Sequence, residues 1–159
     1  MRLLLVGLVV AVGLSAPAAA QTRVACDRAC LTGWLDRYLE ALVAHEPSRL
    51  SLARTVKFTE NGQRLELGDG LWHTITGKGS YRREMADVEA RQAVLMGTIR
   101  EADTPTILVL RLAVVDQQIA EIETLVIRNQ SAAESLDKIG APRVVVVSGF
   151  SRTVFMSAA

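Results

Sequence analysis

Between residues 107 and 128 the apolar positions form two long runs of Ile, Leu and Val, separated by the polar pair Asp116-Gln117. Runs of this length and composition are typical of strands joined by a tight turn. Pro105 marks where the first strand begins. Three charged residues interrupt the apolar runs: Arg111, Glu121 and Glu123. We expect this hairpin to organise the fold, with its charged residues paired or placed at a site, because unpaired charges on a buried sheet are costly.

An amphipathic helix is predicted from Cys30 to His45, where apolar residues recur at i, i+3, i+4 and i+7. Trp34 and Tyr38 lie on its apolar face, where they either belong to the core or line a cavity. His45 falls in the last turn, where a cation suits the helix dipole, and we favour that structural role over a catalytic one. Pro47 ends the helix and opens a short second one.

The segment 56–67 predicts a second hairpin, because Asn61-Gly62 suits a two-residue turn with positive φ at both positions. That turn sets three pairs opposite each other: Phe58 with Leu65, Val56 with Leu67, and Lys57 with Glu66. Of these, the first two lie on one face and the charged pair on the other.

The rest of the chain gives weaker signals. Gly68-Asp69-Gly70 predicts a sharp bend that leads Trp72 and His73 inward or across a rim. Further segments are assigned by pattern as follows: a helical turn or two within 81–91, a strand over 92–101, a helical or irregular stretch over 131–140, and one more strand over 143–147. Residues 148–159 show no clear role.

This order of elements resembles the NTF2-like (SnoaL-like, ketosteroid-isomerase-like) superfamily. The residues that carry the likeness are Tyr38 to Pro47, Thr59 to Gly62, Gly68 to Trp72, Arg111 to Val114, and Ile119 to Glu123. The resemblance implies an α+β cone, in which a curved, mostly antiparallel sheet wraps around a long N-terminal helix and short helices and encloses an apolar pocket. It spans residues 26–129, and residues 130–159 form a C-terminal tail outside it. The Asp-plus-Tyr arrangement of ketosteroid isomerases has no counterpart by position, so that chemistry is not carried over.

Residues 1–20 have the layout of a secretory signal peptide, with one basic residue, an apolar run and a small-residue end at Ala20. We therefore expect export to the periplasm or the extracellular space, with no membrane association after cleavage. In that oxidising setting a disulfide between Cys26 and Cys30 is feasible. Beyond the leader, seventeen basic residues balance seventeen acidic ones, which argues against a nucleic-acid partner.

Glu121 and Glu123, two apart on a strand, share one face with Ile119. Desolvation and mutual repulsion would raise their pKa values and suit one of them as a general base. The alternative is an ion-pair ladder with Arg111 or Arg128 on a solvated or dimer-facing side.

The hairpin register bears on the choice. A two-residue turn at Asp116-Gln117 pairs Arg111 with Ile122, whereas a three-residue turn through Gln118 pairs Arg111 with Glu123. Neither turn has the glycine it would prefer. We favour the first.

A second cluster comes from the shorter hairpin and the loop after it: Glu60, Asp69, Trp72, His73 and Tyr81. The candidate catalytic residues are Glu121, Glu123, His73 and Asp69. The candidate ligand-binding residues are Trp34, Tyr38, Phe58, Glu60, Trp72, Tyr81 and Arg111. No spacing calls for a metal or a cofactor. Two functions fit: a cofactor-independent acid–base enzyme (isomerase, dehydratase or lyase) acting on a small hydrophobic molecule, or a non-catalytic domain that binds such a molecule or forms a homodimer.

Overall fold

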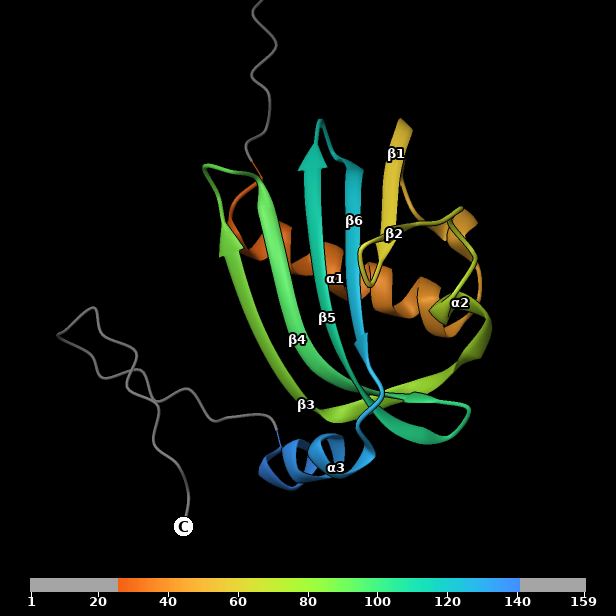
Figure 1. Cartoon of the computed structure of the whole chain (residues 1–159). Coiled ribbons are helices and arrows are strands. Elements are labelled where there is room, and N and C mark those ends of the chain that lie inside the picture. Colours follow the sequence, from red (N-terminus) through yellow and green to blue (C-terminus); the bar gives the residue numbers. More distant parts are fainter. Residues whose placement is uncertain (1–25, 141–159) are drawn as a thin grey trace, which may run out of the picture.

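A computed structural model describes residues 26–140 (Figure 1). The elements in chain order are α1 (Arg28–Val43), the 3-10 helix η1 (Pro47–Arg49), β1 (Leu52–Glu60), β2 (Gln63–Arg64), α2 (Leu71–Thr74), β3 (Ile75–Asp87), β4 (Gln92–Glu101), β5 (Thr104–Val115), β6 (Gln118–Ile127) and α3 (Gln130–Ile139). None of the helices in this part of the chain is both long and apolar enough to cross a membrane.

Helix α1 starts where Asp27 caps it, because the Asp27 carboxylate accepts a hydrogen bond from the Cys30 amide. A disulfide joins Cys26 to Cys30 across this first turn. The helix ends at Val43, two residues before His45, whose φ of 58° stops the helical path. The predicted helix and its short successor at Pro47 are both confirmed.

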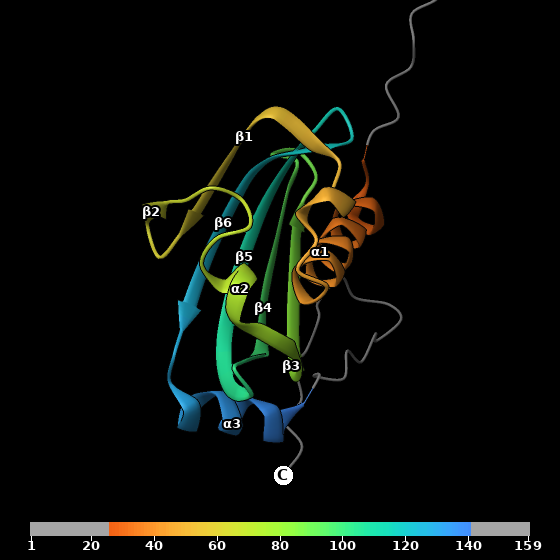
Figure 2. The ribbon, with the colours of Figure 1, turned by 90° about the vertical axis from the view of Figure 1, so that its right-hand side faces the viewer.

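The six strands form one curled sheet in the order β2-β1-β6-β5-β4-β3. Neighbouring strands run antiparallel except β1 and β6, which are parallel. Helix α1 lies along the inner side of the curve, and α3 lies across one end of the strands (Figures 1 and 2). The predicted α+β cone is therefore the fold of this chain.

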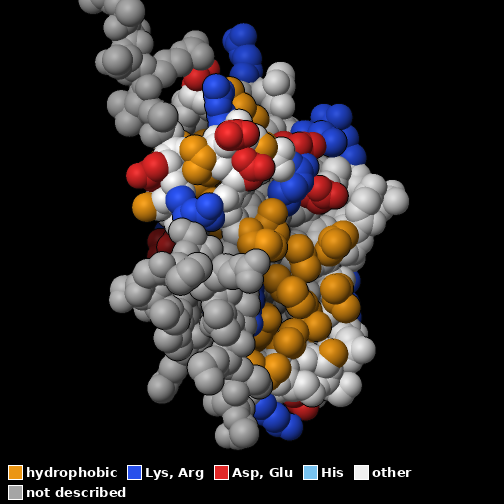
Figure 3. Space-filling model, turned by 90° about the vertical axis from the view of Figure 1, so that its left-hand side faces the viewer, with side chains coloured by type: hydrophobic (Ala, Val, Ile, Leu, Met, Phe, Trp, Pro, Cys, Tyr) orange, Lys and Arg blue, Asp and Glu red, His pale blue; other side chains and the backbone are white. Residues whose placement is uncertain are grey.

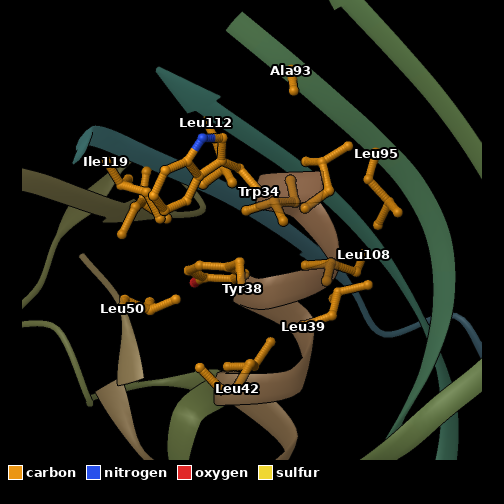
Figure 4. Close-up of a cluster of buried hydrophobic side chains, with 14 of the residues drawn as sticks. Trp34, Tyr38, Leu39, Leu42, Leu50, Ala93, Leu95, Leu108, Leu112 and Ile119 are labelled. Atoms are coloured by element: carbon orange, nitrogen blue, oxygen red, sulfur yellow. The ribbon is translucent and has the colours of Figure 1, made fainter. Parts of the chain in front are cut away.

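The core fills the space between α1 and the inner face of the sheet. Helix α1 contributes seven buried residues: Leu31, Trp34, Leu35, Tyr38, Leu39, Ala41 and Leu42. From the sheet the largest fully buried side chains are Ile75, Leu95, Ile99, Leu108, Leu110 and Leu112. Figure 4 shows the α1 side chains meeting those of the strands. The strand predicted for 92–101 is confirmed as β4, in which Leu95 and Ile99 are buried and Val94 and Met96 are only partly buried.

Two local predictions are wrong. The segment 81–91, expected to be partly helical, instead belongs mostly to β3, because pairing with β4 outweighs the helix preference of its Arg and Glu residues. Lys57 does not face Glu66. The short hairpin keeps the predicted Asn61-Gly62 turn, but β2 ends at Arg64 and β1 pairs along β6 instead.

After β6 the chain continues into α3, so of the two alternatives for 131–140 the structure has a helix. The folded region therefore extends past residue 129. The leader at 1–20, the strand expected at 143–147 and the segment 148–159 lie outside the described residues.

Candidate functional site

Three aromatic side chains meet inside the curve of the sheet. Trp34 and Tyr38 are four residues apart on α1 and so lie on one helix face, and Trp72 comes from α2. All three are almost fully buried. The rings of Tyr38 and Trp72 meet edge to face with centroids 5.4 Å apart, a favourable aromatic geometry. Figure 4 shows Trp34 and Tyr38 projecting from α1 toward Ile119 and Leu50. We call these three residues the aromatic site.

Each residue of the aromatic site has a buried polar atom without a hydrogen-bond partner among the described residues: Trp34 Nε1, Tyr38 Oη and Trp72 Nε1. A buried donor left unsatisfied costs about 1–3 kcal/mol. Native proteins satisfy nearly all such groups, and the exceptions gather at functional sites or bound water. Burial raises the pKa of the Tyr38 hydroxyl far above its usual range; the Trp72 indole N–H is close enough to oppose the rise, and the charge of Glu60 adds to it. The Tyr38 hydroxyl and the Trp72 N–H therefore lie near each other, although they form no hydrogen bond of normal geometry. Tyr38 is therefore a neutral O–H donor.

Glu60, at the end of β1, holds the beginning of α2. Its side chain is buried, and its Oε2 accepts a hydrogen bond from the Leu71 amide at 3.0 Å. Gly70 has a positive φ, and a Cβ there would lie 2.8 Å from that same oxygen. Glycine is therefore required for the bend. The predicted turn of the chain that leads Trp72 inward is confirmed.

His45 makes a second link to α2. Its Nδ1 lies 2.5 Å from the Trp72 carbonyl oxygen, which ties the end of α1 to the residue that completes the aromatic site. The sequence pattern placed His45 in the last turn of the helix. That placement is wrong, because α1 ends at Val43 and His45 lies beyond its C-cap. Its contact with Trp72, 27 residues away, could not have been inferred from local spacing.

Glu121 and Glu123 lie on the outer face of the sheet, away from α1. Arg111 bonds both, with its Nη2 2.8 Å from Glu121 and its Nε 2.9 Å from Glu123. Lys57 completes the row at 2.8 Å from Glu121. Hydrogen bonds from Lys57 and Arg111 lower the pKa of Glu121. The expected rise is therefore wrong for Glu121, because these cations outweigh desolvation.

A β-bulge explains this arrangement. The turn at Asp116-Gln117 has two residues, both with positive φ, as we favoured. The ladder then shifts between Ala113 and Val114, so that Arg111 faces Glu123 rather than Ile122. The extra residue also turns Ile119 into the core. The favoured pairing is wrong, although the favoured turn is right.

The remaining candidate residues lie in different parts of the fold. Asp69 and His73 form an exposed pair, 3.4 Å apart, at the outer end of α2. Phe58 is a core residue of β1. Tyr81 sits on β3, where it lines a cavity of about 50 Å³ with Leu39, Lys78 and Arg82. The predicted second cluster is therefore brought together only at Glu60 and the α2 segment.

Sequence reasoning missed one depression, of about 400 Å³, lined mostly by polar residues where β4, β5 and the start of α3 meet. Arg128 bonds both carboxylate oxygens of Glu101, at 2.7 and 2.8 Å, and Thr74 donates to the same group at 2.7 Å. Hydrogen bonding from Arg128 lowers the pKa of Glu101. Glu101 lies 27 positions from both Thr74 and Arg128, and no motif connects the three residues.

No protein-family model matches the sequence, and no curated protein is similar to it. Solved structures share the fold at low identity. AclR, a suggested hydroxylase from Streptomyces galilaeus, is 12% identical with a TM-score of 0.53 over 68% of this chain and 85% of that one. A protein of unknown function with a cystatin-like fold from Methylobium petroleophilum PM1 is 12% identical with a TM-score of 0.51, over 81% of this chain and 86% of that one. A de novo designed protein with a curved β-sheet is 12% identical with a TM-score of 0.53, over 69% of this chain and 96% of that one.

Proposed function

Because the chain has the α+β cone of the NTF2-like superfamily, we propose that it is an exported domain that binds a small hydrophobic molecule carrying a hydrogen-bond acceptor. The observation that carries the proposal is that three buried polar atoms of the aromatic site make no hydrogen bond of normal geometry to any described residue. A ketone, ester or ether oxygen that reaches the Tyr38 hydroxyl, beside which the Trp72 ring lies, would satisfy at least that donor. The surrounding apolar side chains would move apart to hold the hydrocarbon part. The disulfide at residues 26 and 30 supports an oxidising compartment.

Binding fits the geometry better than catalysis by Glu121 or Glu123. Both carboxylates are ion-paired on the face opposite the aromatic site. A lowered pKa makes Glu121 a weaker base, and its partners occupy the lone pairs a substrate proton would need. Asp69, just before α2, and His73, on α2, are both exposed. Glu121 and Glu123 thus form ion pairs that stabilise the sheet. We therefore assign ligand binding to Trp34, Tyr38 and Trp72.

Intrinsic fluorescence tests the proposal directly, because Trp34 and Trp72 are the two tryptophans of the sequence. The protein is titrated with 2-acetonaphthone, which has a carbonyl acceptor, and with 2-ethylnaphthalene, which has none. The variant Tyr38→Phe is expected to bind the ketone about 2- to 10-fold more weakly, the worth of one hydrogen bond, and the hydrocarbon with unchanged affinity. Its stability should fall little, because the lost hydroxyl makes no hydrogen bond of normal geometry to the described residues.

The matched control is Tyr81→Phe, which removes the hydroxyl of the second tyrosine in the sequence. Tyr81 lines the cavity of about 50 Å³, which no residue of the aromatic site lines, so loss of its hydroxyl should leave both affinities unchanged. Equal weakening of ketone and hydrocarbon in Tyr38→Phe, or no binding of either compound, would contradict the proposal.

Glu60 supports acid–base catalysis in the same interior as a second candidate. It is a buried carboxylate close enough to Tyr38 for its charge to raise the hydroxyl pKa. A carboxylate base and a phenolic donor on one ligand are the groups needed to remove a proton next to a carbonyl. Exchange of the methyl protons of 2-acetonaphthone with D₂O, followed by NMR, should be accelerated by the protein and not by Glu60→Gln. If the methyl protons exchange no faster with the protein than in buffer, this second candidate is wrong and ligand binding remains the proposed function.

A further inference from the structure

An apolar surface remains uncovered on the outer face of the sheet. It consists of Met85 on β3, Val94 and Met96 on β4, Val109 on β5, and Leu125 and Ile127 on β6. The strand registers place Met96, Val109 and Leu125 side by side, with Met85 next to Val94. Met85 is 61% exposed, and Leu125 and Ile127 are each more than 40% exposed. We call these six residues the outer apolar face. Figure 3, viewed from the β3 side, shows a continuous band of hydrophobic side chains.

Helix α3 covers the adjoining end of this face. Asp137 bonds the amides of Ser80 and Tyr81 at 2.9 and 3.2 Å and also the hydroxyl of Thr98, so α3 is fixed to β3 and β4. Thr98 and Ile107 are buried there. Coverage stops where α3 ends at Ile139, which is 65% exposed. The chain therefore leaves α3 at the border of the outer apolar face.

We propose that the C-terminal segment, residues 141–159, covers the outer apolar face. Its sequence, APRVVVVSGFSRTVFMSAA, has four consecutive valines and a second apolar group at 154–156, and no acidic residue. Nineteen residues span up to about 60 Å, whereas Tyr81 to Met85 along β3 is only about 14 Å. The segment therefore reaches the whole face.

The dimensions of the face favour a tethered segment over a second copy. Four strands spaced about 4.8 Å apart, with one or two residues of the face along each, present on the order of 300 Å². A stable interface needs about 800 Å² from each partner, so this face alone is too small for a dimer. One extended segment matches its size, and its tether gives it an effective concentration of about millimolar.

Methionine methyl NMR tests this proposal, because Met85 and Met96 both belong to the face. The full chain is labelled at methionine ε-methyls and mixed with a soluble paramagnetic chelate. In the unaltered protein both methyls should be protected from relaxation. The variants Val145→Asp and Val146→Asp place a charge on alternate sides of the segment, so at least one of them should abolish that protection. Ser151→Asp adds the same charge at a polar position and should preserve it.

The proposal would be overturned if the chelate relaxed both methyls as strongly in the unaltered protein as in the three variants, since the segment would then not cover the face. Protection that is lost on dilution would also overturn it, because a second copy would then be the occupant. Met156 lies in the segment itself and reports whether the label and chelate behave as intended in each variant.

Discussion

Of the partly exposed carboxylates in the described part of the chain, Asp137 is predicted to contribute most to the free energy of unfolding. Its Oδ1 accepts hydrogen bonds from the Ser80 amide and hydroxyl, the Tyr81 amide and the Thr98 hydroxyl. These bonds connect α3 to the irregular part of β3, where the β4 ladder is interrupted between Lys78 and Arg82. In Asp137→Ala the Ser80 amide loses its only described acceptor, while Tyr81 retains Thr98.

The expected loss is about 2 kcal/mol, because a hydrogen bond to a charged group is worth about 1.5–3 kcal/mol and the site is partly solvated. For a domain of this size that lowers Tm by about 8 °C. Urea unfolding followed by circular dichroism measures it, with Glu134→Gln, on the same helix, as the control. A loss no larger than that of the control would refute the reasoning.

The loss should also depend on pH. Burial opposes ionisation of Asp137, but the hydrogen bonds from Thr98, Ser80 and Tyr81 outweigh it and lower the pKa. A carboxyl group with a depressed pKa in the folded state stabilises it above the unfolded pKa, near 4. That stabilisation is lost as pH falls through the folded pKa. The difference in unfolding free energy between the unaltered protein and Asp137→Asn should therefore be full at pH 7 and shrink at pH 3. A difference that grows in acid would contradict this assignment.

Two further predictions concern the outer hairpin and the first turn of α1. Glu121→Gln and Glu123→Gln should each cost no more than about 1 kcal/mol in urea unfolding, since the ion pairs are partly exposed, and should leave 2-acetonaphthone affinity unchanged; altered affinity would restore these glutamates to the ligand site. Replacing Cys26 and Cys30 together by serine should cost at most about 2 kcal/mol, because a five-residue loop restricts the unfolded chain little. A much larger loss in thermal unfolding would show that the disulfide holds more than its own turn.

The sequence predicted most of the fold because its strongest signals are local. The α1 periodicity, the Asn61-Gly62 turn and the long apolar runs of β5 and β6 each act within a few residues, so spacing alone places them. The helical prediction for 81–91 was wrong because the conformation of this segment depends on distant residues. Its helix-favouring composition is overruled by pairing with β4, which a single local pattern does not contain.

The sequence predicted the part of the candidate site whose signals are local. Trp34 and Tyr38 were identified from one helix face, and Trp72 from the glycine bend before it. That their polar atoms lack partners depends on packing between α1 and α2, which spacing does not specify. The roles of His45 and Glu60 in holding α2 likewise depend on contacts between distant segments.

The bulge near Ala120 determines which face of the sheet Glu121 and Glu123 occupy. In a regular strand Ile119, Glu121 and Glu123 share one side, so either the glutamates enter the core or Ile119 leaves it. Both outcomes are unfavourable, because burying two carboxylates and exposing a core isoleucine each cost free energy. One extra residue resolves the conflict by turning Ile119 inward while both glutamates meet Arg111 outside. The aromatic site therefore lies in an interior free of these glutamates, and its neutral donors suit the uncharged ligand that we propose.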